Sequence, residues 1–277
     1  MTNSTKTNSP NNAASNSAPN LQTAPGHQVL AAAGKKVLRP GGHSATEQLL
    51  TWADLQPGET VLELAASFGY SAIALAQRYG VRVTGIEKNP ASVERARANV
   101  AAAGLSDQVT ILEGDIFQLD AIETQFDAVL AEAILTMQSA SGKAKILSGI
   151  ANCLKPGGKF LSHELLVSER TGTDRKAEIY AALRQAIRVN ATPLSETGWV
   201  DVCQAAGLTV VQQQTGRMGL LHLPTLLRDE GLIDTLKIGW NVLTRPVIRQ
   251  RVWGMRRVFQ QHQSDLGYIV LMARKEG

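Results

Sequence analysis

Cysteine is scarce in this sequence, and its two copies stand far apart. Cys153 and Cys203 are the only cysteines among 277 residues, so neither has a second thiol at the spacing of a metal or redox site. Each lies in an apolar, helix-like stretch, which is typical of a buried free thiol. The sequence therefore predicts two core cysteines and no metal site.

Long apolar runs and a strong charge imbalance are lacking as well. No run approaches the ~20 apolar residues that span a bilayer, and the N-terminus has no charged-then-apolar signal pattern, so we expect a cytoplasmic protein. A net charge of +4 is too small to indicate a nucleic-acid partner. Apolar residues make up 44%, enough for one sizeable α/β domain.

The N-terminal segment is poor in apolar and charged side chains. Residues 1 to about 25 are mostly Asn, Ser, Thr, Ala and Pro, with Lys6 as the only charge. We expect a disordered tail over residues 1–26 and one domain over residues 27–277. Residues 27–55 have a helical pattern that Arg39-Pro40-Gly41-Gly42 interrupts, which predicts a helical lid. Ser44, with Glu47 three residues on, predicts a capping box at the second helix.

Strands and helices then alternate regularly. Strands are expected at 60–65, 81–86, 109–113, 126–131 and 159–166, and helices at 70–78, 90–103, 140–153 and 195–206. Such alternation predicts an α/β fold with a parallel sheet and right-handed crossovers. Two further strands, 208–214 and 267–273, enclose a mostly helical insert over residues 216–263.

Three motifs lie where parallel strands end, which is where open α/β sheets bind ligands. Val61–Gly69 runs from a buried strand through a turn of small residues into a helix. Glu87 ends the next strand, and a carboxylate there can accept hydrogen bonds from both hydroxyls of a ribose. Asp115 and Ile116 follow the third strand and could hold an adenine, although Asp115 could equally cap a helix.

With Phe126-Asp127-Ala128-Val129 and Leu154-Lys155-Pro156-Gly157-Gly158, these motifs resemble the class I S-adenosylmethionine-dependent methyltransferase family over residues 58–166. The resemblance implies a Rossmann-like, seven-stranded, mostly parallel sheet with a C-terminal antiparallel hairpin. It also implies S-adenosylmethionine as cofactor and S-adenosylhomocysteine as product. The implied cofactor-binding residues are Glu63, Ala65, Ala66, Gly69, Glu87, Lys88, Asp115 and Ile116. The sequence departs from the family where Ala65 and Ser67 replace turn glycines.

Methyl transfer requires alignment of nucleophile, methyl and sulfur, and it needs a general base only if the acceptor loses a proton. Glu132 and His163 are the candidate catalytic residues, with Glu164 as a further base. Strand alternation places His163 and Glu164 on opposite faces of the sheet. Weaker candidates are His43 and His222. Apolar segments 218–223 and 238–240 could wall a pocket for a small apolar or aromatic acceptor.

Several alternatives remain open. Glu87 would also suit NAD, which allows an NAD-dependent oxidoreductase, although the Gly-x-Gly-x-x-Gly turn is absent. A non-catalytic, methyltransferase-like binding protein is the third possibility. Near residues 245–259, arginines flank an apolar stripe of Ile248, Val252, Met255 and Phe259. This segment is either a membrane-surface helix or a surface helix with a solvated face. The sequence gives no oligomeric state.

Overall fold

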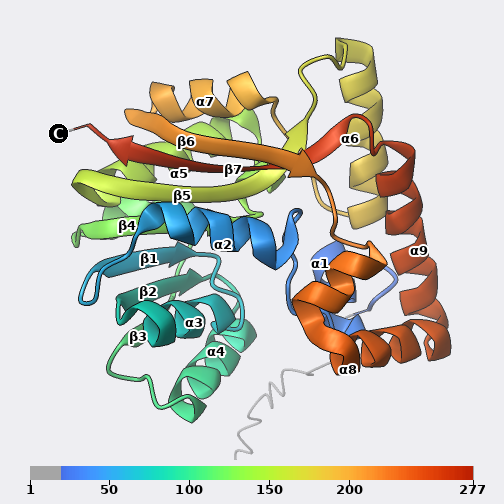
Figure 1. Cartoon of the computed structure of the whole chain (residues 1–277), viewed down its shortest axis with the longest axis horizontal. Helices are drawn as coiled ribbons and strands as arrows, with labels where there is room; N and C mark the ends of the chain where they lie inside the picture. Colours follow the sequence, from blue (N-terminus) through green and yellow to red (C-terminus); the bar gives the residue numbers. More distant parts are fainter. Residues whose placement is uncertain (1–19, 277) are drawn as a thin grey trace, which may run out of the picture.

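A seven-stranded sheet forms the centre of the structure (Figure 1), a computed structural model that describes residues 20–276. The strand order is β3-β2-β1-β4-β5-β7-β6. Strands β1 to β5 pair in parallel, and β7 runs antiparallel between β5 and β6. The strands are β1 Thr60–Leu64, β2 Arg82–Glu87, β3 Val109–Glu113, β4 Phe126–Glu132, β5 Leu154–Val167, β6 Leu208–Arg217 and β7 Leu266–Lys275. The expected sheet and its C-terminal antiparallel hairpin are confirmed.

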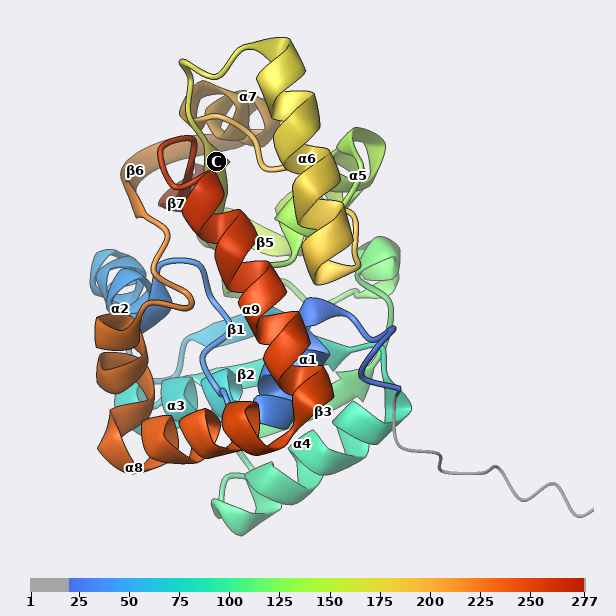
Figure 2. The same cartoon turned by 90° about the vertical axis from the view of Figure 1, so that its right-hand side faces the viewer.

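Helices cover both faces of this sheet and its carboxyl-terminal edge. One face carries α2 Gly42–Ala53, α3 Tyr70–Tyr79 and α4 Pro90–Ala102; the other carries α5 Ala140–Cys153, α7 Glu196–Ala205 and the 3-10 helix η1 Ile116–Ala121. A short 3-10 helix, η2 Leu135–Met137, follows β4. The remaining helices, α1 Gly26–Ala33, α6 Thr173–Ile187, α8 Leu223–Thr244 and α9 Pro246–Gln261, contact one another beside the sheet (Figure 2).

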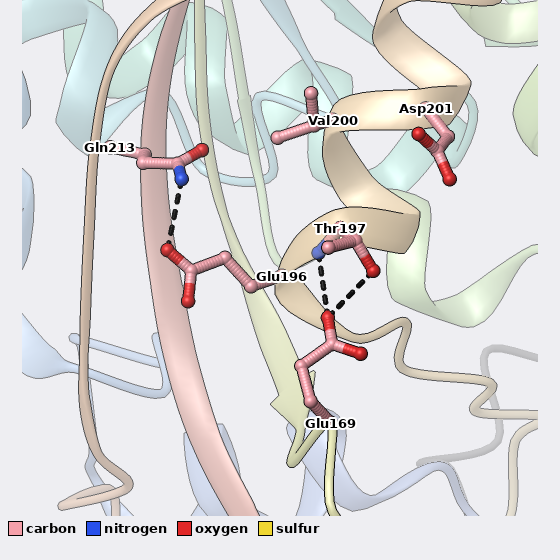
Figure 3. A pocket seen from close by; sticks show the side chains of 6 residues that line it. All are labelled: Glu169, Glu196, Thr197, Val200, Asp201 and Gln213. Carbon is pink, nitrogen blue, oxygen red and sulfur yellow. Dashed lines mark hydrogen bonds between the residues drawn. The ribbon is translucent and has the colours of Figure 1, made fainter.

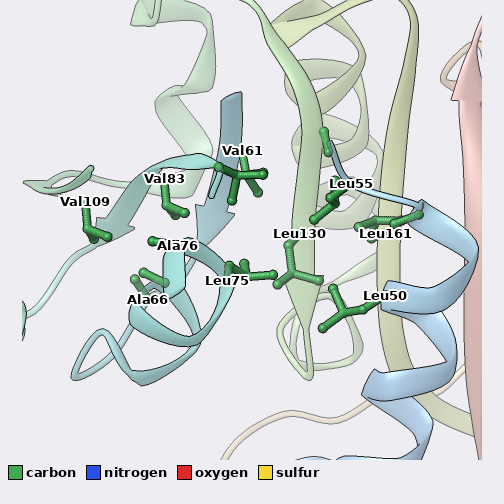
Figure 4. Close-up of a cluster of buried hydrophobic side chains, with 14 of the residues drawn as sticks. Leu50, Leu55, Val61, Ala66, Leu75, Ala76, Val83, Val109, Leu130 and Leu161 are labelled. Carbon is green, nitrogen blue, oxygen red and sulfur yellow. The ribbon is translucent and has the colours of Figure 1, made fainter. Parts of the chain in front are cut away.

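Alternation along the strands builds two hydrophobic cores. Val61, Leu130 and Leu161 face α2 and α3, as Figure 4 shows. Their neighbours in sequence, such as Leu62 and Phe160, are buried against α5 and α7 on the other face. Burial of each such side chain stabilises the fold by about 1.5–3 kcal/mol. The thiols of Cys153 and Cys203 lie buried in the second core, as expected.

The start of α2 differs from the sequence prediction. The helix begins at Gly42, so Ser44 lies inside its first turn, and no side-chain hydrogen bond caps the helix. The predicted capping box is therefore wrong. A carboxylate from another element accepts a hydrogen bond from the first turn instead: the His43 backbone N–H donates to Asp229 Oδ1 at 3.0 Å.

Two further segments differ from expectation. Helix α6 occupies residues that the sequence pattern had not marked as helical, and its buried Ile179 and Leu183 pack with α1 and α9. Residues just before residue 27 are also packed, because Ala24 is buried and Arg251 donates to the carbonyl of Ala24 at 2.9 Å. The predicted tail is thus too long at its C-terminal end, and its residues 1–19 lie outside the described part.

The apolar stripe near residues 245–259 faces the protein. Ile248, Met255 and Phe259 are buried, and Met255 and Phe259 join the cluster that α1 and α6 build. This stripe therefore stabilises the cap and is not free to enter a lipid surface. Among residues 20–276, no helix is both long and apolar enough to cross a membrane.

Candidate functional site

The carboxyl ends of β1, β4 and β5 bring three polar side chains to one face of the sheet. Glu63, Glu132 and His163 lie two residues beyond Val61, Leu130 and Leu161, so strand alternation points all six toward α2. The sheet register pairs Glu132 directly with His163. Glu63 and His163 are buried, and the side chain of Glu132 is 7% exposed. The two predicted catalytic residues are thus neighbours beneath the N-terminal segment.

That segment, residues 39–46, closes over the pair. Thr46 Oγ1 donates to Glu132 Oε1 at 2.6 Å, and Arg39 Nη2 lies 2.9 Å from Glu132 Oε2. The Gly41 N–H donates to His163 Nε2 at 3.0 Å, which leaves the His163 proton on Nδ1, 3.4 Å from Glu132 Oε1. A Cβ at Gly41 would lie 2.6 Å from Ala45 Cβ. Only glycine fits this close approach.

The two carboxylates of this cluster titrate in opposite directions. Burial raises the pKa of Glu63 to about 8, and Arg39 only partly offsets this effect. Burial alone would also raise the pKa of Glu132, but Arg39, His163 and Thr46 together outweigh it and lower that pKa. Burial lowers the pKa of His163. At neutral pH the site therefore holds an ionised Glu132, a protonated Glu63 and a neutral His163.

The turn between β1 and α3 keeps a backbone shape that glycine normally supplies. Ala65, Ser67 and Gly69 have φ angles of 55°, 51° and 77°. Left-handed backbone costs a residue with a Cβ roughly 1–2 kcal/mol, so the turn is held in place by its surroundings. The Ala66 side chain points into the core beside Gly85, which leaves only its backbone on the ligand side.

Glu87 lies next to this turn at the end of β2. Its Oε2 accepts from the Ser67 N–H at 2.9 Å and its Oε1 from the Asn89 N–H at 2.8 Å. These two bonds fix the carboxylate, and each oxygen keeps a second lone pair for a ligand. The sequence spacing alone predicted this proximity of turn and acid.

Asp115 follows β3 and already has partners. Lys88 Nζ donates to its Oδ2 at 2.7 Å, and the Phe117 N–H donates to its Oδ1 at 3.1 Å. The Lys88 hydrogen bond is the main reason that the pKa of Asp115 is lowered. Asp115 therefore caps η1, as the alternative interpretation held, and Ile116 beside it is half-buried against the α5 side of the sheet.

Other candidates from the sequence lie away from the cluster. The imidazole of His43 is largely exposed, 3.6 Å from Glu47, and His222 is an exposed residue before α8. Glu164 points to the opposite face, where it accepts from the backbone N–H of Leu135 at 2.8 Å. Trp240 is 69% exposed.

The contacts of Arg39 and Thr46 were not anticipated as functional. Arg39 reaches three different elements, because it also donates to Thr46 Oγ1 at 3.3 Å and to Ser71 Oγ. Within the described chain, Glu63 Oε2 is a buried oxygen without a hydrogen-bond partner, close to this guanidinium. The only signal in the sequence was the position of Arg39 in the predicted lid.

A hollow of about 230 Å³ lies elsewhere, between α7, β6 and the segment after β5 (Figure 3). Glu169 there accepts from the Thr197 N–H at 2.7 Å, and Glu196 accepts from Gln213 Nε2 at 2.9 Å. The hollow shares no residue with the Glu132–His163 cluster.

The site residues fit a nucleoside cofactor with an amino-acid tail. Glu87 offers lone pairs to a ribose, the left-handed turn brings backbone close to the ligand, and the unpartnered Glu63 Oε2 can accept from an amino group. An NAD-binding doubly wound sheet has the strand order 3-2-1-4-5-6. The antiparallel β7 between β5 and β6 departs from that order, which removes the NAD alternative.

Comparisons with known proteins give the same result. A family model described as a methyltransferase domain matches residues 61–158. An uncharacterized protein of Haemophilus influenzae is 32% identical over 250 residues, which cover 90% of this chain and 98% of that protein. A sterol 24-C-methyltransferase of Yarrowia lipolytica is 34% identical over 116 residues, 42% of this chain but only 30% of the relative.

Among solved structures, an S-adenosylmethionine-dependent methyltransferase from Thiobacillus denitrificans, in complex with S-adenosylhomocysteine, has a TM-score of 0.65 at 18% identity. The match covers 90% of this chain and 98% of that one, which extends the likeness in fold over the cap helices. Sheet order, strand-end acids and these matches agree. The chain belongs to the class I S-adenosylmethionine-dependent methyltransferases.

Proposed function

We propose that this methyltransferase acts on a small apolar or aromatic acceptor, held between the strand ends and the helical cap. The observation that carries the proposal is the ionised Glu132 at the end of β4, whose side chain is 7% exposed. An apolar cluster lies at the end of the neighbouring strand β5, where the half-buried Leu38, Met137 and Tyr180 pack against the group that contains Leu165 and Val167. A buried base beside an apolar cluster suits an apolar acceptor that loses a proton, such as a phenol or a thiol.

The proposal places the cofactor at the ends of β1, β2 and β3. Glu87 would hold the ribose hydroxyls, and Asp115, with Ile116 beside it, the adenine. Glu63 and the backbone of residues 65–69 would hold the methionine portion. When bound, S-adenosylmethionine supplies a sulfonium-activated methyl group, which makes alignment of the acceptor the main task of the protein.

Glu132 is the group that would accept the acceptor proton. Its carboxylate is ionised, and its contacts with Arg39 and Thr46 keep it aimed at the site. His163 would act as a positioning residue, because its Nε2 is already engaged by Gly41 and its Nδ1 faces Glu132. Lid residues 39–46 and the cap insert 216–263 would exclude water and select the acceptor.

Turnover of matched acceptors tests this proposal. Formation of S-adenosylhomocysteine is measured with phenols, thiols and aromatic amines, and with amino acids as small charged acceptors. We expect turnover with the apolar group alone. Glu132→Gln should lower kcat by about 100-fold or more for acceptors that lose a proton and leave cofactor affinity unchanged. Exposed Glu94→Gln is the control. Turnover of amino acids alone, or an unaltered kcat in Glu132→Gln, would refute the proposal.

A further inference from the structure

The second half of α8 is apolar on both of its sides. Thr235 and Ile238 are buried against the cap, and Ile238 packs with Ala33 and Ile248. On the opposite side Leu232, Leu236, Trp240 and Leu243 follow one another at helical spacing, and each is between 60% and 70% exposed. A surface helix of a globular protein normally carries polar residues on its outer side. This row, the outer stripe of α8, therefore lacks a partner within the described chain.

Helix α9 lies next to the outer stripe of α8, and its exposed side is positively charged. Trp253 is 60% exposed, and Arg249, Arg256 and Arg257 lie one helical turn before and after it. Arg249 Nη1 donates to the Leu243 carbonyl at 3.3 Å, so the basic side of α9 meets the end of the outer stripe. Figure 2 shows α9 facing the viewer and α8 at the lower left.

Charge is concentrated in this part of the chain. Residues 232–261 contain six basic side chains and one acidic side chain, Asp234, an excess larger than the +4 of the whole protein. Asp234 is paired with Lys36 at 2.7 Å and Lys237 at 2.9 Å. Within residues 20–276, no carboxylate lies within ion-pair distance of Arg256 or Arg257. Their charge is available to an external anion.

We propose that the outer stripe of α8 and the basic side of α9 form a docking face for an anionic lipid membrane. Exposed leucines would enter the acyl boundary, tryptophans prefer the interface, and arginines would contact acidic headgroups. A second copy of the chain is disfavoured as occupant, because a two-fold contact through this face would bring two basic segments together. The buried stripe of Ile248, Met255 and Phe259 takes no part.

Vesicle binding of the full-length protein tests the proposal. Co-sedimentation is measured with phosphatidylcholine vesicles, with and without phosphatidylglycerol, at low and high salt. We expect binding to the anionic vesicles, weakened by salt, and quenching of tryptophan fluorescence by brominated acyl chains. No binding to anionic vesicles at low salt would overturn the proposal.

Paired variants locate the face. Leu236→Gln with Trp240→Gln should weaken vesicle binding on the order of 100-fold, and Arg256→Gln with Arg257→Gln roughly 30-fold. Matched controls are exposed Leu112→Gln with Val211→Gln, and exposed Arg170→Gln with Arg184→Gln. Their affinity should stay unchanged, with circular dichroism confirming that all four fold. Equal losses in the controls, or a dimer in solution that Trp240→Gln dissociates, would contradict membrane docking.

Discussion

Arg39 Nη2 lies 2.9 Å from Glu132 Oε2 and joins the N-terminal segment to the end of β4. The two side chains are 20% and 7% exposed, so water screens their attraction only weakly. Removal of one partner from such a pair leaves a charge that is costly to keep buried. The pair therefore couples closure of the lid to ionisation of the proposed base.

Replacement of Arg39 tests this coupling. In Arg39→Gln, burial of Glu132 is no longer offset by the guanidinium, so the pKa of the carboxyl should rise. The acid limb of the pH profile of kcat/KM should then shift to higher pH, and amide hydrogen exchange of residues 36–41 should become faster. Arg78→Gln, which removes an exposed partner of Glu47, is the control. An acid limb at the same pH in Arg39→Gln would show that Arg39 does not lower the pKa of Glu132.

Stability should fall with pH because of Glu63. Its pKa is about 8 in the fold against an ordinary value of 4.5, so the folded state holds a proton that the unfolded state has lost. The free energy of unfolding should therefore decrease as pH rises from roughly 4.5 to 8. Glu63→Gln should remove this component of the pH dependence, and urea unfolding across that range measures it. Exposed Glu94→Gln should keep the slope; a Glu63→Gln slope equal to the wild type would be incompatible with a protonated Glu63.

Glycine at positions 65 and 67 should relieve backbone strain in the turn between β1 and α3. Ala65→Gly with Ser67→Gly removes the energy cost of left-handed backbone at a residue with a Cβ. Glycine also has more backbone freedom in the unfolded state, which offsets part of this stabilisation. We therefore expect a net stabilisation of about 1 kcal/mol. Ala66→Gly is the matched control: Ala66 is 4% exposed and lies outside the left-handed region, so its loss should destabilise by about 1 kcal/mol. Thermal unfolding measures both variants. Destabilisation by both would show that the turn is unstrained.

The alternation of strands and helices was predictable because each element has a local signal. Strand β1 has the apolar residues Val61, Leu62 and Leu64 and is followed by small residues, and Asn89 caps α4 through the Ser92 N–H, as expected. Helix α6 has a weaker signal, since only Ile179, Leu183 and Ile187 of its residues are buried, and tertiary contacts with α1 and α9 decide its structure.

The site was predictable where strands position it. Glu132 ends β4 and His163 is its register partner on the adjacent parallel strand β5, so their sequence positions imply their proximity. Arg39 and Thr46 come from a lid that no local pattern orients, and 86 residues separate Thr46 from Glu132. Likewise, the sequence indicated an amphipathic α9, but only the packed cap reveals which side of α8 is left exposed.

The most direct measurement is the affinity for S-adenosylhomocysteine by titration calorimetry, for the wild type and for Glu87→Ala. Hydrogen bonds from a charged acceptor to two hydroxyls contribute about 1.5–3 kcal/mol each, so the account predicts a loss of roughly 100-fold or more. Glu113→Ala removes the acid that pairs in register with Glu87 on β3, and it should leave affinity unchanged. Unaltered binding in Glu87→Ala would contradict the ribose site at the end of β2, and with it the cofactor geometry proposed for this enzyme.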